Sequence, residues 1–299
     1  MYFSNKEFKI MKGIILSGGT GSRLFPLTLS ISKQIIPIYD KPMIYYPLSV
    51  LMLAGIKDIM IITNKDHISI FKDQLGNGSS LGIKISYEVQ DNPNGIPEAF
   101  LISEKFIGNQ NVVLILGDNL LYGQKLGALL KSSFNQKNGA KIFLHQVKNP
   151  NEYGVIEFNL QKKIKKIIEK PKKIKSNFAI TGLYLFDKKV VSLSKKLKPS
   201  GRNELEITDL LNIYLKKSQL KYEILGRGFT WFDAGTHDSL LLASQFIKAI
   251  EDRQGHKIGC IEEIAYANKW IDKLKLKKYL FKYKNSSYGQ YLNKILEQN

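Results

Sequence analysis

The sequence predicts an α/β protein built on a doubly wound, mostly parallel sheet, with an appended β–α region and helices at the C-terminal end. Two observations support this prediction. In the first half, short runs rich in Ile, Val and Leu, each bounded by Gly, Asn or Asp, alternate with helical segments, as buried parallel strands and their crossover helices do. In the second half the order changes to a hairpin, one further strand and then helices.

The first half supplies most of the expected sheet. Its apolar runs predict strands at residues 12–17, 59–63, 83–88, 112–116 and 140–147. Between the first two strands, residues 42–54 are expected to form a helix, with Asp40 placed to cap its first turn. This order of strand and helix is that of a sheet covered by helices on both faces.

The second half is expected to extend this sheet and then to turn helical. The predicted hairpin and the strand after it cover residues 155–158, 164–169 and 179–186. Helices are expected at residues 206–215, at 239–253, and from residue 261 to a last segment near 288–296. We find no internal repeat and no linker rich in Pro, Gly or Ser, so we expect one continuous domain.

The beginning of the chain and its cysteine content set further expectations. Residues 1–10 are polar and carry no pattern, so we expect a disordered or non-family extension before a domain at residues 11–299. The single cysteine, Cys260, cannot form an internal disulfide and is expected in the core. The most apolar stretch, residues 43–56, is interrupted by Pro47 and too short for a bilayer. We therefore expect a cytoplasmic enzyme with no membrane partner.

The chain is strongly basic, with a formal net charge of +19. Such an excess occurs in nucleic-acid-binding proteins. Here the lysines are spread along the chain, and their densest runs, residues 162–175 and 269–284, are interpreted as solvated faces. We therefore expect no nucleic-acid partner, although the charge would attract polyanionic substrates to a phosphate-binding cleft.

A glycine-rich segment, residues 16–24, directly follows the first predicted strand. Glycines let a loop adopt positive φ angles and bring backbone N–H groups close to an anion. Arg23 adds a planar fork of donors suited to phosphate oxygens. The spacing differs from both the dinucleotide fingerprint and the Walker loop. An ordinary glycine-rich turn is the alternative interpretation of this segment alone.

Two aspartates follow predicted strands far apart in the sequence. Asp118 comes directly after the strand at residues 112–116, and Asp233 ends a short apolar run that includes Trp231. Carboxylates at the C-terminal edge of a parallel sheet would form a hard-oxygen site for Mg²⁺. Each alone is more simply a turn residue or a helix cap. Lys33, ten residues after Arg23, would supply a second cation, although alone it is one surface lysine among many.

Other polar residues offer weaker or negative evidence. Glu169 and Lys170 end the predicted hairpin and could bind a sugar hydroxyl and a phosphate, but a hairpin edge of alternating charge explains them equally. The histidines are scattered without metal-ligand spacing, and no Gly-x-Ser-x-Gly elbow is present. Zinc chemistry and serine-hydrolase chemistry are therefore not expected.

Taken together, these motifs resemble those of the glucose-1-phosphate thymidylyltransferases, members of the sugar-nucleotidyltransferase superfamily. The resemblance runs from Met11 to the C-terminal end, through residues 18–24, 31–34, 39–48, 116–119, 152–155, 169–171, 181–184, 204–209, 231–233, 235–240 and 288–292. It implies a nucleotide-binding part at about residues 11–150 and a sugar-binding and assembly part at about 151–299.

The resemblance also implies roles for individual residues. The catalytic residues would be Arg23, Lys33, Lys170, Asp118 and Asp233, of which Asp118 and Asp233 would bind Mg²⁺. The nucleotide would contact Leu16, Gly18, Gly19, Thr20, Gly21, Arg23, Lys33, Gln34, Gln90, Gly95 and Asp118, with Gln90 and the backbone of Gly95 reading the thymine edge. The sugar would contact Tyr153, Gly154, Glu169, Lys170, Ile180 and Trp231.

The implied reaction is the Mg²⁺-dependent transfer of dTMP from dTTP to glucose 1-phosphate, the first step of dTDP-rhamnose or related deoxysugar synthesis. The family further implies a homotetramer with a second nucleotide site at a subunit interface. Three alternatives remain: the same transfer from UTP, a catalytically silent nucleotide-sensing relative, and a basic RNA-binding protein. The last lacks clustered aromatic residues on a basic face.

Two positions depart from the family pattern. Residues 95–99 read Gly-Ile-Pro-Glu-Ala where the family usually has Gly-Leu-Ala-Gln-Ala, so Pro97 and Glu98 stand beside the expected nucleobase pocket. Nucleobase preference is the property that this departure would affect. Asn203 stands where a glycine is common, and there it would affect a turn rather than the chemistry.

Overall fold

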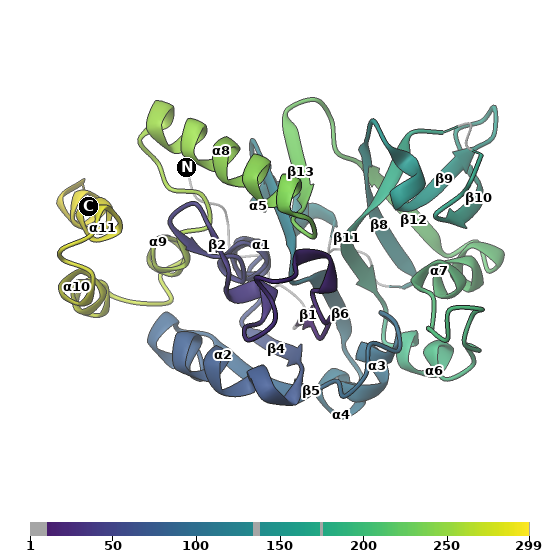
Figure 1. Ribbon diagram of the computed structural model, residues 1–299, viewed down its shortest axis with the longest axis horizontal. Coiled ribbons are helices and arrows are strands. Elements are labelled where there is room, and N and C mark those ends of the chain that lie inside the picture. Colours follow the sequence, from purple (N-terminus) through teal and green to yellow (C-terminus); the bar gives the residue numbers. More distant parts are fainter. Residues whose placement is uncertain (1–10, 134–137, 174–175, 299) are drawn as a thin grey trace.

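A computed structural model describes residues 11–133, 138–173 and 176–298. A nine-stranded sheet runs through these residues in the order β10-β9-β11-β6-β1-β4-β5, and β8 and β12 extend it beside β11 (Figure 1). The predicted α/β fold with a mostly parallel sheet is confirmed. The expected extension at residues 1–10 lies outside the described residues.

The parallel core consists of four strands whose predicted positions agree with the structure to within a residue. They are β1 (Met11–Ser17), β4 (Asp58–Thr63), β5 (Lys84–Val89) and β6 (Asn111–Leu116). Central β1 pairs in parallel with β4 and with β6, so that Ile14 lies opposite both Met60 and Leu114. Because these strands end at the same edge, the segments that follow β1 and β6 lie side by side.

The second half adds strands that run in both directions relative to this core. These are β8 (Ala140–Gln146), β9 (Gly154–Phe158), β10 (Ile164–Glu169), β11 (Phe178–Phe186) and β12 (Leu220–Ile224). The predicted hairpin of β9 and β10 is antiparallel, as expected. The strand expected at residues 140–147 is present as β8, which pairs in parallel with β12 and antiparallel with β11. Its apolar composition indicates burial and says nothing about its neighbour.

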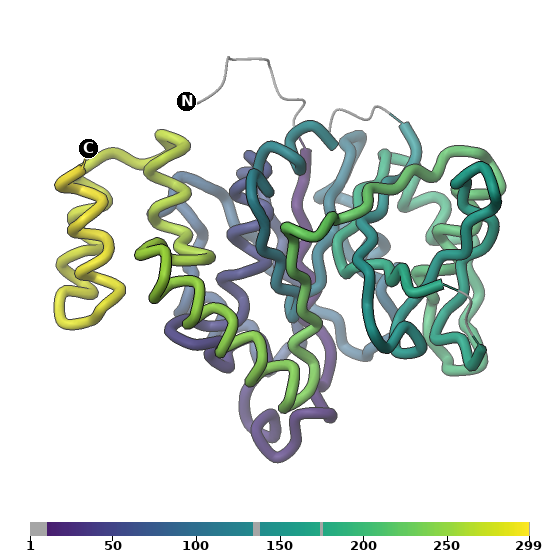
Figure 2. Tube along the Cα trace, turned by 90° about the horizontal axis from the view of Figure 1, so that it is seen from above, coloured from purple at the N-terminus to yellow at the C-terminus, as the bar shows by residue number. Residues whose placement is uncertain are grey.

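Helices cover both faces of the sheet, and five of them precede or flank the parallel core. They are α1 (Tyr45–Leu53), α2 (Ile68–Leu75), α3 (Glu98–Ile102), α4 (Glu104–Ile107) and α5 (Leu126–Ser133). The remaining helices are α6 (Val190–Ser194), α7 (Ile207–Lys216), α8 (His237–Gln254), α9 (Ile261–Ala267), α10 (Lys273–Lys282) and α11 (Ser287–Gln298). Figure 2 shows the C-terminal helices at one end of the molecule and the β9–β10 region at the other.

Short elements connect these helices and strands. Single 3-10 turns are η1 (Ser22–Leu24), η2 (Lys33–Ile35), η3 (Lys65–His67), η4 (Ser79–Leu81) and η5 (Pro150–Glu152). Two small antiparallel ribbons lie outside the main sheet: β2 (Pro37–Ile38) with β3 (Lys41–Pro42), and β7 (Asn119–Gly123) with β13 (Phe229–Asp233). The second ribbon joins the two halves of the sequence.

Two of the three apolar clusters in the described core lie on opposite faces of the sheet. Neighbouring residues on a strand point to opposite faces, so Ile14 packs with α3, α6 and α7 while Ile15 packs with α1 and α9. Both side chains are fully buried. Burial of a strand on both faces accounts for its continuous apolar run in the sequence. Cys260 is also buried, as predicted.

The predicted cap of the first helix is wrong. α1 begins at Tyr45, with Ile44 at its N-cap position and no side-chain cap. Asp40 instead pairs with Lys41 and Lys257. The intervening β3 strand separates Asp40 from the helix, and this ribbon was not visible as a pattern in the sequence. Over the described residues, no helix combines the length and the apolar character needed to span a membrane.

Candidate active site

The glycine-rich loop begins where β1 ends and lies at the carboxyl edge of the parallel strands. Gly18 is buried against Gln90: a Cβ atom added to Gly18 would lie 2.3 Å from the Gln90 side-chain oxygen. Gly19 and Thr20 are exposed, and a Cβ atom at Gly19 would meet nothing within 4 Å. Gly21 has a φ of 69°, which favours glycine. The loop therefore presents backbone to open space, as an anion cradle requires.

Arg23 leaves this loop and reaches across to the end of β13. Its side-chain Nη2 atom would lie 2.3 Å from a Cβ atom added to Gly235, so any larger residue there would displace the guanidinium. The same Cβ position is 2.9 Å from Asp233 Oδ1. Gly235 therefore provides the space in which Arg23 and Asp233 lie side by side.

Lys33 and Asp118 form an ion pair between η2 and the turn after β6. Asp118 is only 8% exposed, and its other carboxylate oxygen accepts a hydrogen bond of 3.0 Å from the amide of Asn119. Burial alone would raise the pKa of Asp118, but the Lys33 charge and these hydrogen bonds lower it. The carboxylate is therefore held ionised at the sheet edge.

Asp233 lies beside Asp118 because β13 pairs with β7. Asp233 stands opposite Asn119 in that ribbon, and the backbone N–H of Ala234 donates to the carbonyl oxygen of Asp118 at 2.9 Å. Burial, together with the negative charge of Asp118, raises the pKa of Asp233 to about 6, and the nearby cations only partly oppose this. Its Oδ1 atom is buried and accepts no hydrogen bond within the described part of the chain.

An unpartnered buried carboxylate oxygen next to a second carboxylate is a costly arrangement that a cation would relieve. The donor set fits Mg²⁺, which binds through one or two carboxylates and completes its shell with substrate phosphates and water. Within the described ranges, no group of three or more His, Cys, Asp or Glu side chains could hold a metal by itself. The residues thus fit a metal that arrives with a polyphosphate rather than a closed protein cage.

The predicted sugar contacts gather on the other side of this pair. The rings of Tyr153 and Trp231 lie 5.0 Å apart. Glu169 ends β10 opposite Gly154, with a carboxylate oxygen 3.3 Å from the position of a Gly154 Cβ atom. Ile180 is buried beneath the same glycine. Burial and the negative charge of Glu206 raise the pKa of Glu169, while Arg202, at 3.6 Å, opposes this.

Lys170 and Gln34 differ in their exposure at the site. Lys170 is exposed directly after β10, with a φ of 39°, and its charge acts on Asp233 and Glu169. Gln34 is 2% exposed and accepts a hydrogen bond of 2.7 Å from Ser32, against the backbone of Gly117. Gln34 therefore lies under the site as a support, whereas Lys170 faces it.

The structure adds a residue to which no role was assigned from sequence. Asn119 accepts hydrogen bonds from the Trp231 indole at 2.5 Å and from the Gly182 backbone N–H at 2.9 Å. It thereby links β7, β13 and β11, and holds Trp231 in place. Its neighbour Asp118 drew attention as a carboxylate, but an amide that binds other protein groups carries no signal in the sequence.

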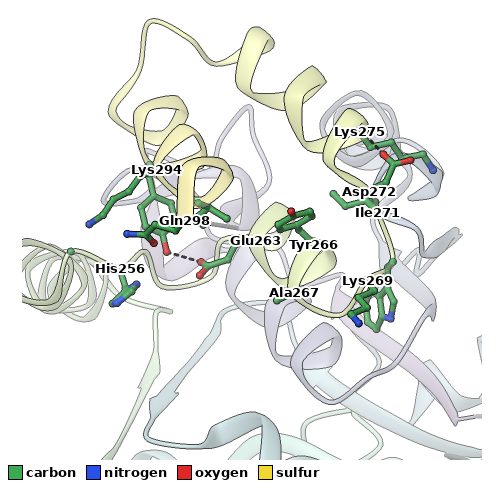
Figure 3. Close-up of a pocket in the computed structure, with 14 residues that line it drawn as sticks. His256, Glu263, Tyr266, Ala267, Lys269, Ile271, Asp272, Lys275, Lys294 and Gln298 are labelled. Atoms are coloured by element: carbon green, nitrogen blue, oxygen red, sulfur yellow. Dashed lines mark hydrogen bonds between the residues drawn. The ribbon is translucent and has the colours of Figure 1, made fainter. Parts of the chain in front are cut away.

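A pocket of about 740 Å³ lies elsewhere, between α9 and the C-terminal helix α11 (Figure 3). Glu263 points into it and accepts a hydrogen bond of 2.8 Å from the Tyr291 hydroxyl. None of the predicted catalytic, nucleotide or sugar residues lines this pocket. The candidate active site is therefore identified by the chemistry of its side chains, not by the volume of a pocket.

This fold and its paired carboxylates among cations are those of a nucleotide-binding α/β enzyme. The chain belongs to the nucleotidyl transferase family, whose sequence profile matches residues 12–250. It is 51% identical over 288 residues to the glucose-1-phosphate thymidylyltransferase of Neisseria meningitidis (serogroup A, strain DSM 15465 / Z2491), covering 96% of this chain and 100% of the relative. It is 47% identical to that of Mycobacterium tuberculosis (strain ATCC 25618 / H37Rv), covering 97% and 100%.

Solved structures of similar enzymes share this fold. A Bacillus anthracis structure described as a glucose-1-phosphate thymidylyltransferase in complex with sucrose matches with a TM-score of 0.74 and 46% identity, over 79% of this chain and 94% of that chain. A UDP-glucose pyrophosphorylase in complex with UDP-glucose matches with a TM-score of 0.70 and 26% identity, over 80% and 99%. The resemblance inferred from the sequence motifs is confirmed.

Proposed function

We propose that this enzyme transfers dTMP from dTTP to glucose 1-phosphate, releasing pyrophosphate and forming dTDP-glucose. The observation that carries the proposal is the meeting of Asp118 and Asp233 with Arg23 and Lys33 at the edge of the sheet where the glycine loop begins. The names of the relatives described above support the choice of nucleotide and sugar.

The reaction is a displacement at phosphorus. A phosphate oxygen of glucose 1-phosphate forms a bond to the α-phosphorus of dTTP, and the bond from that phosphorus to the bridging oxygen of the β-phosphate breaks. The electron pair leaves with pyrophosphate. Because a sugar phosphate is already ionised at neutral pH, the enzyme needs no general base. Its task is to align two anions that repel each other.

Three cationic side chains would bind the phosphates of the two substrates. Arg23 and the exposed backbone of Gly19 and Thr20 would bind the triphosphate, and Arg23 would neutralise charge that grows on the departing pyrophosphate. Lys33, which pairs with Asp118, would bind the α-phosphate. Lys170, exposed beyond β10, would bind the phosphate of the incoming sugar. Each cation therefore serves a different phosphate.

Asp118 and Asp233 would hold Mg²⁺, which when bound supplies Lewis-acid stabilisation of phosphate charge. The unpartnered Oδ1 atom of Asp233 supports this assignment. On the sugar side, Tyr153 and Trp231 would form an aromatic wall, and Glu169 would accept hydrogen bonds from sugar hydroxyls. Asn119 would fix the angle of that wall through its bond to the indole.

Several finer expectations belong to the same proposal. We infer that the enzyme is cytoplasmic, assembles as a homotetramer, and provides dTDP-glucose for dTDP-rhamnose or another deoxysugar. Residues 11–150 would bind the nucleotide, and residues 151–299 the sugar and the neighbouring subunits. Light scattering coupled to gel filtration would test the assembly: a monomer mass at micromolar concentration would contradict it.

Pyrophosphate release, measured with glucose 1-phosphate, Mg²⁺ and each of dTTP, UTP, ATP, CTP and GTP, tests the proposed reaction. We expect dTTP to lead and chelation of Mg²⁺ to stop the reaction. Thymine and uracil differ by one methyl group, which an apolar pocket distinguishes by about 1–3 kcal/mol. The structural similarity to a UDP-glucose pyrophosphorylase makes UTP the second candidate. Binding of dTTP without turnover of any triphosphate would favour the silent regulatory alternative.

A further inference from the structure

Helices α9, α10 and α11 follow residue 250, where the nucleotidyl transferase profile ends. α10 and α11 lie at one end of the molecule, away from the sheet whose edge forms the candidate active site (Figure 1). None of the predicted site residues lies on these three helices. Their outer surfaces are therefore available for a role other than catalysis.

α10 packs against the rest of the protein along one side. Its Leu276 side chain is fully buried, and Leu280 packs against the same apolar core. The opposite side carries two large apolar side chains in solvent: Leu274 is 71% exposed and Phe281 is 74% exposed. Because these two residues are seven positions apart, about two helical turns, they point in the same direction. α10 thus presents an apolar pair away from the protein.

Lysines surround this apolar pair. Residues 273–284 contain six lysines and no acidic residue, and all six lysines are exposed. Lys277 and Lys278 lie between Leu274 and Phe281 along the helix, and the Nζ atom of Lys284 lies 5.0 Å from the centre of the Phe281 ring. None of the six forms an ion pair with a carboxylate of the described residues. We call this surface the basic face; it consists of Leu274, Lys277, Lys278 and Phe281, with Lys273, Lys282 and Lys284 at its edges.

Few carboxylates offset the charge of the basic face. Asp272 caps the first turn of α10, where its carboxylate accepts a hydrogen bond of 2.8 Å from the Lys275 backbone N–H. Glu297 on α11 lines the same groove as Lys273 and Lys277. Residues 269–298 hold eight lysines and these two acidic residues, so their formal net charge is +6. This end of the molecule therefore attracts anionic surfaces.

We infer that the basic face binds the surface of an anionic lipid bilayer. Leu274 and Phe281 would enter the boundary between the headgroups and the acyl chains, and α10 would lie in the plane of that boundary. The lysines would keep their ammonium groups at the lipid phosphates while their methylene stems lie along the apolar region. The expectation of no membrane partner rests on the lack of a spanning segment, and a helix that lies on a bilayer needs none.

Other partners of suitable charge match the basic face less completely. RNA would place phosphates near the lysines and could stack a base on Phe281, but it offers no apolar region to Leu274. A second copy of α10 would set lysines against lysines, which is unfavourable. A bilayer supplies anions next to an apolar layer, and this arrangement matches that of the lysines and the apolar pair.

Co-sedimentation of the full-length protein with lipid vesicles tests the inference. Vesicles of phosphatidylglycerol and phosphatidylcholine in equal amounts provide an anionic surface, and vesicles of phosphatidylcholine alone provide a neutral one. We expect the protein to sediment with the anionic vesicles and to remain in solution with the neutral ones. Raising the ionic strength to about 0.5 M should weaken binding, because salt screens the lysine charges.

Two double variants remove the two parts of the basic face separately. Leu274→Gln with Phe281→Gln keeps the net charge and should lower the vesicle partition coefficient roughly tenfold or more. Lys277→Gln with Lys278→Gln keeps the apolar pair and should lower this coefficient by a similar factor. Because glutamine is a good helix former and all four side chains are exposed, the thermal unfolding midpoint should stay close to that of wild type.

The opposite end of the molecule supplies matched controls (Figure 2). Leu160, at the turn between β9 and β10, is 98% exposed, and Lys162 and Lys163 follow it at the surface. Leu160→Gln, and Lys162→Gln with Lys163→Gln, repeat the two chemical changes away from α10 and should leave vesicle binding unchanged. If the net charge of the chain alone caused binding, the lysine control would weaken it as much as Lys277→Gln with Lys278→Gln does, and the inference would fail.

Phe281→Trp reports insertion directly. An indole that moves from water into the headgroup boundary emits at shorter wavelength, and tryptophan is well suited to that boundary. After subtraction of the wild-type emission from Trp231 and Trp270, we expect the emission of Phe281→Trp to shift to shorter wavelength with anionic vesicles and not with neutral ones. Vesicle binding without such a shift would mean that another surface makes the contact.

The remaining outcomes also decide the inference. Failure of the wild-type protein to sediment with anionic vesicles would overturn it, and so would equal binding by wild type and both α10 variants. Binding of an RNA oligonucleotide that is lost in the same variants, without vesicle binding, would assign the basic face to nucleic acid instead. Pyrophosphate release without vesicles should be the same in wild type and every variant, so the outcome for the proposed reaction is measured independently.

Discussion

Two clusters of charged side chains among the described residues differ in whether all their carboxylate oxygens have a hydrogen-bond or ion-pair partner. In the closed cluster, formed by Asp40, Lys41, Glu251 and Lys257, each lysine pairs with both carboxylates. Glu251 also accepts a hydrogen bond of 2.9 Å from the Ile258 backbone. The two positive and two negative charges of this cluster fasten α8 to the β2–β3 ribbon.

The site cluster, formed by Arg23, Lys33, Asp118 and Asp233, has the same formal charges. Unlike the closed cluster, it leaves one carboxylate oxygen without a partner. Lys33 pairs with Asp118, whereas the Oδ1 atom of Asp233 is buried without a hydrogen-bond donor among the residues described. In the closed cluster, which serves stability alone, every carboxylate therefore has a cationic partner. An unsatisfied carboxylate at the sheet edge is therefore interpreted as a place prepared for a ligand.

The largest expected effect comes from neutralising either carboxylate of the site cluster. Asp118→Asn and Asp233→Asn should each lower the rate of pyrophosphate release by about 10³-fold or more, because charge stabilisation at the phosphates is lost. Asp233→Asn should not lower the thermal midpoint, since it removes repulsion from Asp118. An assay of pyrophosphate release measures the rate, and thermal unfolding of the same samples measures the midpoint. Full activity in both variants would refute the metal assignment.

Breaking the closed cluster should instead affect stability. Lys41→Met leaves two buried carboxylates to share Lys257, and should lower the free energy of unfolding by about 3 kcal/mol. Chemical denaturation measures this change. The matched control is Lys248→Met, which breaks an exposed pair with Asp252 on the same helix α8 and should leave the unfolding midpoint unchanged. Equal destabilisation by both changes would contradict the comparison.

The hydrogen bond from Trp231 to Asn119 offers a smaller, more specific effect. Trp231→Phe keeps an aromatic ring beside Tyr153 but removes the indole N–H that holds its orientation. We expect the KM for glucose 1-phosphate to rise roughly fivefold, with the KM for dTTP little changed, since the loss of one buried hydrogen bond is worth about 1 kcal/mol. A rise in the KM for dTTP alone would contradict the proposed contact between Trp231 and the sugar.

The smallest effect concerns Glu262, a buried carboxyl in α9 that accepts a hydrogen bond of 2.6 Å from the Tyr288 hydroxyl. Burial raises the pKa of Glu262. A raised native pKa means that the folded state retains the proton, so wild-type stability is lost as pH rises through that pKa. Glu262→Gln should therefore unfold at a higher temperature than wild type at pH 8, with the gap narrowing toward pH 5. A gap that widens at low pH would contradict this sign.

Local patterns predicted the parallel core well because burial on both faces leaves a direct record in the sequence. The runs that became β1, β4 and β6 are mostly apolar, and the glycine loop follows β1 as expected. Partners distant in sequence left no such record. Neither the antiparallel placement of β8 beside β11 nor the exchange of Asp40 from a helix cap to an ion pair could be inferred from composition.

The candidate site shows the same division. Asp118 and Asp233 are recognisable in the sequence because carboxylates after apolar strands suggest metal binding. Their proximity depends on the pairing of β7 with β13, two strands that lie far apart in the sequence. Asn119 carries no such signal, because an amide that binds other protein groups resembles any turn residue in the sequence. Glu98 was visible only as a departure from a family pattern, and its hydrogen bond to Gln90 required the structure.

The proposed role of Asp233 is to bind a metal together with the nucleotide, which would give its unpartnered Oδ1 atom a partner. Calorimetric titration of Mg²⁺ into the protein saturated with dTTP, in wild type and in Asp233→Asn, tests it most directly and without turnover. We expect saturable Mg²⁺ binding to the wild-type complex and a roughly tenfold or greater loss of affinity in Asp233→Asn. Equal Mg²⁺ affinity in the two folded proteins would contradict it.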